Sequence, residues 1–469
     1  MPPTDQTKQR DITIIGGGII GCTTAYFLTR HPSYSPSAHR ITLLEAASTS
    51  SGGRTGDSIT DPGALAGEPG RAQEINPAHD GIAGGASGKA GGLLARWAFP
   101  ANIVPLSFGL HDELAREHGG AARWGYRRCH AGQVECRARM PGGGAGEYAL
   151  AAADGEGEEV EEVTKGLHKD HRRAIGGSGP GRLRTLGAPQ DLDWLDAEEA
   201  LVAYDGMGTP DDTAQVHPEL FTRSIAQLAE EGGVRIVTGA RATAITRDDS
   251  SNGGRVEGVT YINTKDGDGR EEHLPTTDCI VAAGPWTPRL LPGIPVQASR
   301  AHSVVIRTPR PLSPYALFTS IALPAGFPSP SPSQQQQQQQ QTVEPEIYAR
   351  PDGTAYACGP TDSAVPLPLT AAGVEVDRAR CDDIAAQAGA VSDELGRGGE
   401  VLARQACYLP QGGPFIGPVP GHDGVVVAAG HTCWGIQNAP GTGKLVSEIV
   451  FDGEAVSARL GGCDPSRVV

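Results

Sequence analysis

The chain has 469 residues, and its 39 lysines and arginines stand against 55 acidic residues, so its formal net charge is −16. A chain of this length exceeds one simple core and is expected to form two domains, separate or interleaved. A negative field repels nucleic acids and anionic lipids, so we expect no nucleic-acid partner. The nine cysteines are scattered and never spaced as CxxC, which argues against a disulfide framework and against any metal site.

The apolar runs of the chain do not predict export or membrane insertion. The first, ITIIGGGII at residues 12–20, is short and rich in glycine, and acidic residues precede it, so it makes a poor signal peptide. No stretch reaches the ~18 apolar residues that cross a bilayer, and the final SRVV is not an SKL-type peroxisomal signal. We therefore expect a soluble cytoplasmic protein without a transmembrane segment, with association with endosomes as the alternative location. The oligomeric state is not predicted.

The first predicted elements form a βαβ unit. Residues 11–15 and 40–45 predict short apolar strands, and residues 19–30 between them have the apolar spacing of a helix. Further elements of the same kind are predicted downstream: a helix at 217–233 that begins near Pro218, and strands at 234–239, 278–284 and 424–430.

A second group of segments predicts an antiparallel sheet, namely 300–307, 346–359 with a turn at Asp352-Gly353, and 400–409. Because the two kinds of segment alternate along the chain, we expect the two domains to share the sequence discontinuously. Three segments lack an apolar period and are rich in Gly, Ser, charged residues or Gln. They are expected to be disordered or low-complexity insertions: 48–81, 142–189 and 329–342.

The motif Gly16-x-Gly18-x-x-Gly21 follows a predicted strand and opens a predicted helix. The first glycine allows a tight turn, the second lets the backbone approach a pyrophosphate, and the third lets the helix pack on the strand. Glu45 ends the next strand, where an acid can accept hydrogen bonds from a ribose 2′-hydroxyl. Together these residues predict a dinucleotide site, and a glycine-rich turn with a surface glutamate is the alternative.

Three further segments indicate which dinucleotide: GIAGGASGKAGGLLA (81–95), DCIVAAGPWTPRLL (278–291) and VVVAAGHTCWGIQNAPGTGKLV (425–446). With the glycine motif, they resemble the FAD-dependent oxidoreductase family of D-amino acid oxidase, glycine oxidase and sarcosine oxidase, and the ASGKAGG form is most similar to a fungal branch of oxidoreductases. The resemblance implies an α/β fold in which a Rossmann-like FAD-binding domain interleaves with a substrate domain built on an antiparallel sheet. It places the FAD-binding domain at 8–47, 82–112, 212–292 and 405–460, and the substrate domain at 113–141, 190–211, 293–332 and 343–404.

The resemblance also implies positions for FAD. The glycine motif would hold the pyrophosphate, Glu45 the ribose, and the amides at the start of the last helix the pyrimidine edge of the flavin, since a helix N-terminus favours the charge of a reduced flavin. Lys89 would add a cation near the phosphates, or else be a solvated loop lysine. The full set of cofactor residues is Gly16, Gly18, Ile19, Ile20, Gly21, Glu45, Ala86, Ser87, Gly88, Lys89, Ala90, Gly91, Gly92, Leu93, Ala242, Ala283, Gly284, Trp286, Gly430, Gly435, Ile436 and Gln437.

The substrate site departs from the family pattern. Glycine-oxidase-like members place an arginine where this chain has Leu409, and sarcosine-oxidase-like members place a lysine where it has Gln437; each cation pairs with a substrate carboxylate. An ordinary amino acid is therefore not the expected substrate unless another arginine takes over this pairing. The preferred replacement is Arg350. The remaining candidates for the pocket or its anchor are Arg96, Arg300, Tyr348, Trp434, Gln437 and His431, and His302 is read as a structural histidine.

Cys407 stands in ACYLPQGGPFIGP, residues 406–418, close to the position at which sarcosine oxidase bonds its flavin. The glycine-oxidase-like members, whose P-x-I-G ending is matched at 414–417, hold FAD without a bond. A buried cysteine also serves as a small apolar residue. We expect non-covalent FAD and a bend of the chain beneath the flavin, with a bond to Cys407 as the alternative.

The resulting expectation is an FAD-dependent oxidoreductase of the amine and amino acid oxidase type. Hydride would pass from the carbon of a C–N bond to flavin N5, with oxygen as the electron acceptor. The expected substrate is a small amine or imino compound without a carboxylate anchor. One alternative is an amino acid held by another arginine, and another is a flavin-binding regulatory protein with little turnover that acts in endosomal trafficking. No catalytic acid or base is predicted.

Overall fold

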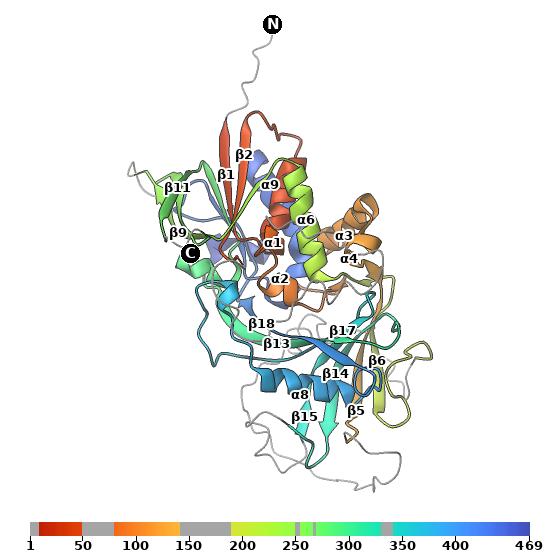
Figure 1. Ribbon diagram of the computed structural model, residues 1–469. Coiled ribbons are helices and arrows are strands. Elements are labelled where there is room, and N and C mark those ends of the chain that lie inside the picture. The colour runs from red at the N-terminus through yellow and green to blue at the C-terminus, as the bar shows by residue number, and fades with distance from the viewer. Residues whose placement is uncertain (1–8, 49–78, 141–188, 249–253, 266–268, 330–340) are drawn as a thin grey trace.

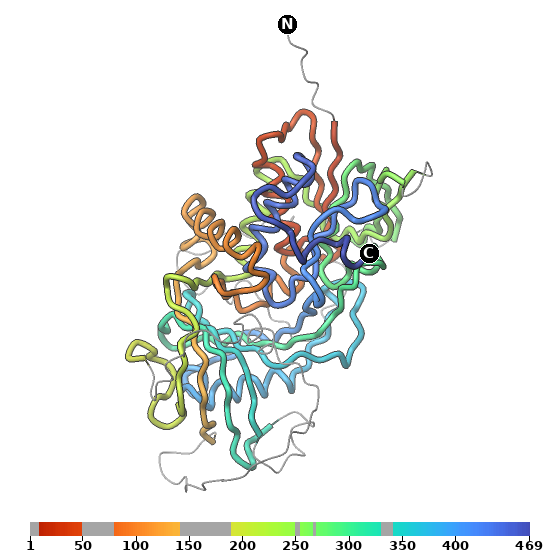
Figure 2. The backbone as a smooth tube through the Cα atoms, turned by 180° about the vertical axis from the view of Figure 1, so that it is seen from behind, coloured from red at the N-terminus to blue at the C-terminus, as the bar shows by residue number. Residues whose placement is uncertain are grey.

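The structure is a computed structural model that describes residues 9–48, 79–140, 189–248, 254–265, 269–329 and 341–469. It has two halves (Figure 1). The upper half is built on a parallel sheet with helices α1 (Ile19–Arg30), α6 (Pro218–Glu231) and α9 (Gly435–Asp452), and the lower half on a large sheet with helix α8 (Arg378–Gly389). The chain passes between the halves several times, so that α9 near the C-terminus packs beside α1 near the N-terminus (Figure 2).

The upper sheet has the strand order β19-β20-β12-β1-β2-β8, and every neighbouring pair is parallel except β19-β20. Side chains alternate along the strands: Ile12 and Ile14 face the three helices, whereas Ile15 faces a small antiparallel sheet on the other side. Strands buried on both faces need continuous Val/Ile/Leu runs, as the sequence has. The strands are β1 (Arg10–Ile15), β2 (His39–Glu45), β8 (Arg235–Thr238), β12 (Asp278–Val281), β19 (Phe415–Pro418) and β20 (Val425–Ala429), and the small sheet holds β9 (Ala240–Arg247), β10 (Val256–Asn263) and β11 (Glu271–Pro275).

The lower sheet has the order β18-β13-β17-β16-β14-β5-β6, with β15 paired to β14, and its neighbours are antiparallel except β5 and β14. Helix α8 packs on one face through Cys381, Ile384 and Ala388. The strands are β5 (His130–Arg137), β6 (Leu201–Gly208), β13 (Gln297–Arg307), β14 (Tyr315–Leu323), β15 (Gln341–Val343), β16 (Glu346–Ala349), β17 (Thr354–Asp362) and β18 (Glu400–Gln411).

Shorter elements join the halves. Helix α2 (Ala86–Lys89) leads into a three-stranded sheet of β3 (Leu93–Ala95), β7 (Thr213–Gln215) and β4 (Arg127–Arg128). Helices α3 (Val104–His118) and α4 (Gly120–Trp124) follow β3 in the chain. The 3-10 turns η2 (Gly284–Arg289), η3 (Ala371–Gly373) and η4 (Thr432–Trp434) complete the parts that concern the site.

The predicted fold class is confirmed: a Rossmann-like α/β half interleaves with a half built on a mainly antiparallel sheet. The predicted hairpin at Asp352-Gly353 joins β16 to β17, with Gly353 at φ 75°. The bend predicted around Cys407 needs correction, because β18 pairs with β13 as far as Gln411 and the turn begins only after it. Pro410 is tolerated there since β18 is an edge strand. The predicted insertions lie almost wholly outside the described residues.

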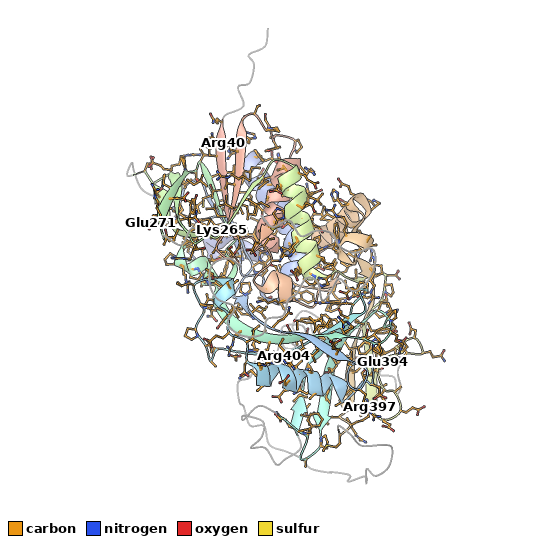
Figure 3. All side chains as sticks on the ribbon, viewed as in Figure 1. Arg40, Lys265, Glu271, Glu394, Arg397 and Arg404 are labelled. Carbon is orange, nitrogen blue, oxygen red and sulfur yellow. The ribbon has the colours of Figure 1, made fainter. Side chains whose placement is uncertain are left out.

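Charged side chains are found at the surface of both halves, among them Arg40 and Glu271 on the upper half and Arg397 on the lower half (Figure 3). Within the parts of the chain that the structure describes, no helix is both long and apolar enough to cross a membrane.

Candidate functional site

A cavity of about 270 Å³ lies at the carboxyl ends of the parallel strands, between the two halves of the molecule. Its walls are the ends of β1, β2, β12 and β20, the starts of α1 and α9, and part of β18. Crevices at the carboxyl ends of parallel strands are where α/β proteins bind dinucleotides. Because the amide ends of α1 and α9 both lie at this cavity, two of its regions favour negative charge.

The three glycines of the motif have different surroundings. Gly16 adopts φ 117°, and a Cβ there would lie 2.3 Å from the carbonyl oxygen of Ala282. A Cβ on Gly21 would lie 1.9 Å from the carbonyl oxygen of Gly16, because the helix packs directly on the turn. A Cβ on Gly18 would meet only the Ser87 hydroxyl, at 3.1 Å. The fold thus requires Gly16 and Gly21, whereas Gly18 keeps the cavity open.

Glu45 ends β2 at the cavity wall. Its Oε2 accepts a hydrogen bond from the Gly17 amide and its Oε1 accepts one from the Ala47 amide, each at 2.7 Å. Burial raises the pKa of Glu45, while these amides lower it. Each carboxylate oxygen keeps a second lone pair, so Glu45 can also accept hydrogen bonds from a ligand hydroxyl.

The structure brings most of the predicted cofactor residues together. Those that line the cavity are Gly16, Gly18, Ile19, Ile20, Glu45, Ala86, Ser87, Ala90, Ala242, Ala283, Gly284, Trp286, Gly430, Gly435 and Ile436. Those that do not line it are Gly21, Gly88, Lys89, Gly91, Gly92, Leu93 and Gln437. The second group supports the wall from behind; Gly91, for example, lies against the ring of Tyr348, 2.1 Å from where its Cβ would be.

Lys89 points toward β18 and does not line the cavity. Its Nζ donates to the carbonyl oxygen of Ala406 at 3.0 Å, and burial lowers its pKa. The residue is therefore neither the predicted phosphate cation nor a solvated loop lysine, because it links α2 to the lower sheet.

The four predicted substrate-pocket residues also lie behind the wall. The hydroxyl of Tyr348 donates to Glu346 at 2.5 Å, and Arg350 donates to the carbonyl oxygen of Ala90 at 2.8 Å. Trp434 packs edgewise on Trp97, with ring centroids 5.8 Å apart. Gln437 accepts from the amide of Ala95 at 2.8 Å. Three of these residues hold the backbone of residues 90–95: Tyr348 packs on Gly91, Arg350 binds Ala90 and Gln437 binds Ala95.

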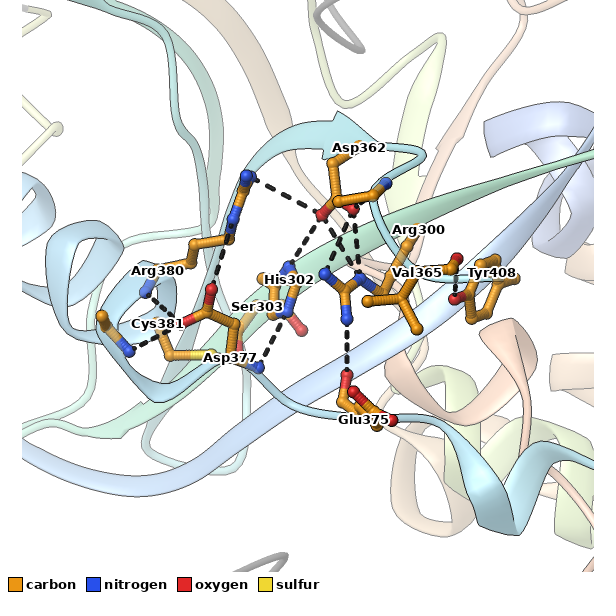
Figure 4. A network of polar contacts seen from close by, with 12 residues as sticks. Arg300, His302, Ser303, Asp362, Val365, Glu375, Asp377, Arg380, Cys381 and Tyr408 are labelled. Atoms are coloured by element: carbon orange, nitrogen blue, oxygen red, sulfur yellow. Dashed lines mark hydrogen bonds and ion pairs between the residues drawn. The ribbon is translucent and has the colours of Figure 1, made fainter. Parts of the chain in front are cut away.

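The other proposed anchors are engaged elsewhere. Arg96 is exposed and lies over the ring of Phe108 at 5.1 Å. Arg300 is 4% exposed and pairs with Asp362 at 3.2 Å, in a network that also includes His302 (Figure 4). These positions exclude Arg96 and Arg300 from the cavity wall.

His431 does line the cavity. Its Nε2 lies 3.0 Å from the Thr442 hydroxyl, and burial lowers its pKa to about 3. The imidazole is therefore neutral at physiological pH.

Cys407 is 5% exposed and packs with Ala301, Leu409 and Ala86. It does not line the cavity, although Leu409, two residues along the strand, does. Burial raises the pKa of the Cys407 thiol to about 11, so the thiol is protonated at neutral pH. These contacts suit a packing residue directly behind the wall.

No sequence pattern indicated one side of the cavity, which is formed by Leu369, Thr370 and Ala371. They follow β17 in a segment without strand or helix periodicity, and they reach the cavity only through long-range folding. Arg241, Thr243, Arg289, Tyr408 and Pro410 also line it and were not predicted.

Comparison with known proteins agrees with this geometry. A model of the DAO family, described as FAD dependent oxidoreductase, matches residues 11–60 and 78–449. The chain is 30% identical to "Putative oxidoreductase TDA3" of Saccharomyces cerevisiae, over 99% of this chain and 96% of that protein. The chain therefore belongs to the DAO family of FAD-dependent oxidoreductases, and the predicted family is confirmed.

Two solved structures show the same fold. Glycine oxidase from Bacillus cereus has a TM-score of 0.61 and 16% identity, covering 95% of this chain and 96% of its own. Glycine oxidase from Geobacillus kaustophilus has a TM-score of 0.61 and 18% identity, covering 98% of this chain and 100% of its own.

The residues that line the cavity are suited to bind FAD. Gly18 leaves space at the amide end of α1 for a pyrophosphate, and Glu45 offers acceptors to a ribose. The start of α9 and the apolar residues Leu409 and Ile436 provide a surface on which a ring with a polar edge can lie.

Proposed function

We propose that the protein binds FAD non-covalently in this cavity and oxidises a C–N bond of a small amine or imino compound that lacks a carboxylate. The observation that supports this is the composition of the wall where β18 meets the start of α9. There the described lining residues include Tyr408, Leu409, His431 and Ile436 but neither lysine nor arginine. Since a carboxylate is held best by a paired cation, a neutral wall favours a substrate without one.

The residues of the chain have three tasks in this proposal. The amides at the starts of α1 and α9 favour the negative charge of the pyrophosphate and of the pyrimidine edge. Glu45 orients the ribose, and Leu409 with Ile436 excludes water from the ring. When bound, FAD would supply the acceptor for the hydride, and oxygen would reoxidise the reduced flavin. His431, neutral above about pH 4, does not serve as a proton donor at physiological pH.

The test is anaerobic reduction of the bound flavin, followed at ~450 nm, with matched pairs of compounds. Each amine is compared with the amino acid that differs from it only by a carboxylate. We expect the amines to reduce the flavin and to produce hydrogen peroxide when air is admitted. Reduction by glycine, sarcosine or D-amino acids instead would show an amino-acid oxidase with an unrecognised anchor. Reduction by dithionite alone would favour a flavin-binding regulatory protein.

The attachment of FAD is tested separately by acid precipitation. Flavin that stays in the supernatant supports non-covalent binding and a packing role for Cys407. Flavin that stays in the pellet would contradict the proposal and point to Cys407.

A further inference from the structure

Residues 363–376, here called the strap, connect β17 to α8 and form one side of the cavity through Leu369, Thr370 and Ala371. No residue of the strap is fully buried. Leu369 lines the cavity and is 64% exposed, so its apolar side chain does not anchor the strap in a core.

Polar side chains of the FAD-binding half and of β18 hold the middle of the strap by its backbone. The indole of Trp286 donates to the Pro368 carbonyl at 2.7 Å, and Arg289 donates to the Leu367 carbonyl at 3.0 Å. The Tyr408 hydroxyl donates to the Val365 carbonyl at 2.7 Å. Water can replace each of these bonds when the strap lifts, and little apolar surface would be exposed, so opening costs far less than unfolding.

A cluster of charged groups closes the base of the strap (Figure 4). Arg380 spans its two ends, 3.6 Å from the Asp362 carboxylate and 3.5 Å from that of Asp377. His302 also spans them, since its Nε2 accepts from the Asp377 amide at 3.1 Å and its Nδ1 lies 3.7 Å from Asp362. Arg300 pairs with Asp362 and donates to the Glu375 carbonyl at 3.3 Å.

We propose that the strap is an openable wall of the cofactor site through which FAD enters and leaves, and that the charged cluster at its base sets the rate of release. The proposal rests on FAD occupying the cavity, as the family implies, and not on the identity of the substrate. A strap fixed in place would need apolar anchors in the core, and the described residues 363–376 contribute only Val376, which is partly buried, to a core cluster.

The test measures the dissociation rate of oxidised FAD from the full-length holoprotein, using an excess of a second apoflavoprotein as a trap and no substrate. Arg380→Met removes the link between the two ends of the strap. Because the Arg380 side chain is 33% exposed, we expect the variant to fold. Arg300→Lys keeps a cation beside Asp362 but loses the paired geometry. Arg404→Met is the matched control. Arg404 lies on β18 and binds Asp382 at 2.6 Å; Asp382 is on α8, the helix that also carries Arg380, and the bond does not involve the strap.

We expect Arg380→Met and Arg300→Lys to release FAD about three to ten times faster than Arg404→Met. Hydrogen exchange of the strap amides should be slow in the holoprotein and fast in the apoprotein. Release rates equal to the control in both variants, or equal strap exchange with and without FAD, would overturn the proposal. Flavin that stays bound to acid-precipitated wild-type protein would also overturn it, since a covalently held cofactor is not exchanged. Failure of every amine to reduce the flavin would leave these rates unaffected and would count only against the proposed reaction.

Discussion

Gly18→Ala should separate FAD binding from folding. Gly18 has φ −76° and ψ 176°, an extended conformation that alanine adopts freely, and its Cβ would meet only the Ser87 hydroxyl. The new methyl group would therefore occupy the space that the pyrophosphate needs at the amide end of α1. A hydrogen bond to a charged group contributes about 1.5–3 kcal/mol. Loss of one such bond corresponds to a rise in the Kd for FAD of roughly 10- to 150-fold.

The assay titrates the apoprotein with FAD and follows quenching of flavin fluorescence, with urea unfolding of the same apoprotein beside it. The free energy of unfolding should change by less than about 1 kcal/mol. Gly109→Ala in α3 is the control: its Cβ meets nothing within 4 Å, so binding should be unchanged and stability should rise by about 0.8–1 kcal/mol. A Kd for Gly18→Ala within twofold of wild type would refute the placement of the pyrophosphate.

Three further predictions follow from single contacts. Gly21→Ala should lower the free energy of unfolding of the apoprotein by about 3 kcal/mol or prevent folding, because its Cβ would lie 1.9 Å from the carbonyl of Gly16; a near-native urea midpoint would contradict this. Burial lowers the pKa of His111 to about 4 against ~6.5 in the unfolded state, so between these values only the unfolded state binds this proton. As the pH is lowered from ~6.5 to about 4, the free energy of unfolding should therefore decrease by up to about 1.4 kcal/mol per pH unit. His111→Gln should flatten the dependence of stability on pH over that window, and an unchanged slope would show that His111 is not the group involved. Cys407→Ala should leave the flavin spectrum and its release by acid unchanged while costing about 1 kcal/mol of stability, and a shifted spectrum would revive the covalent alternative.

The parts that the sequence predicted correctly depend on local chemistry. The βαβ unit follows from two apolar strands around a glycine turn, and the hairpin at Asp352-Gly353 follows from the residues that a tight turn requires. The strap could not be predicted, because its position at the cavity depends on distant side chains: Trp286 is 82 residues from Pro368, which it binds, and Tyr408 is 43 residues from Val365.

The candidate substrate residues show why a correct strand does not locate a pocket. Tyr348 and Arg350 were placed on a strand of the sheet that faces the cofactor half, and both do contact that half. Ala90, to which Arg350 donates, lines the cavity, whereas Tyr348 and Arg350 do not, and no periodicity in β16 indicates this contact with a distant segment. The face of a strand is a local property, whereas what covers that face is not.

Three of the cations around the cavity already hold its walls. Lys89 donates to the carbonyl of Ala406, Arg350 to that of Ala90, and Arg289 to the carbonyl of Leu367 in the strap. Arg289 is exposed, but a substrate carboxylate could recruit Lys89 or Arg350 only by leaving a main-chain acceptor without its partner, which costs about 1–3 kcal/mol for a buried group such as the Ala406 carbonyl. An amine needs no such exchange. Arg350, the preferred anchor, is thus already engaged in the wall, and this engagement supports the proposed substrate without a carboxylate, because recruiting Arg350 would disturb the wall as well as the charge.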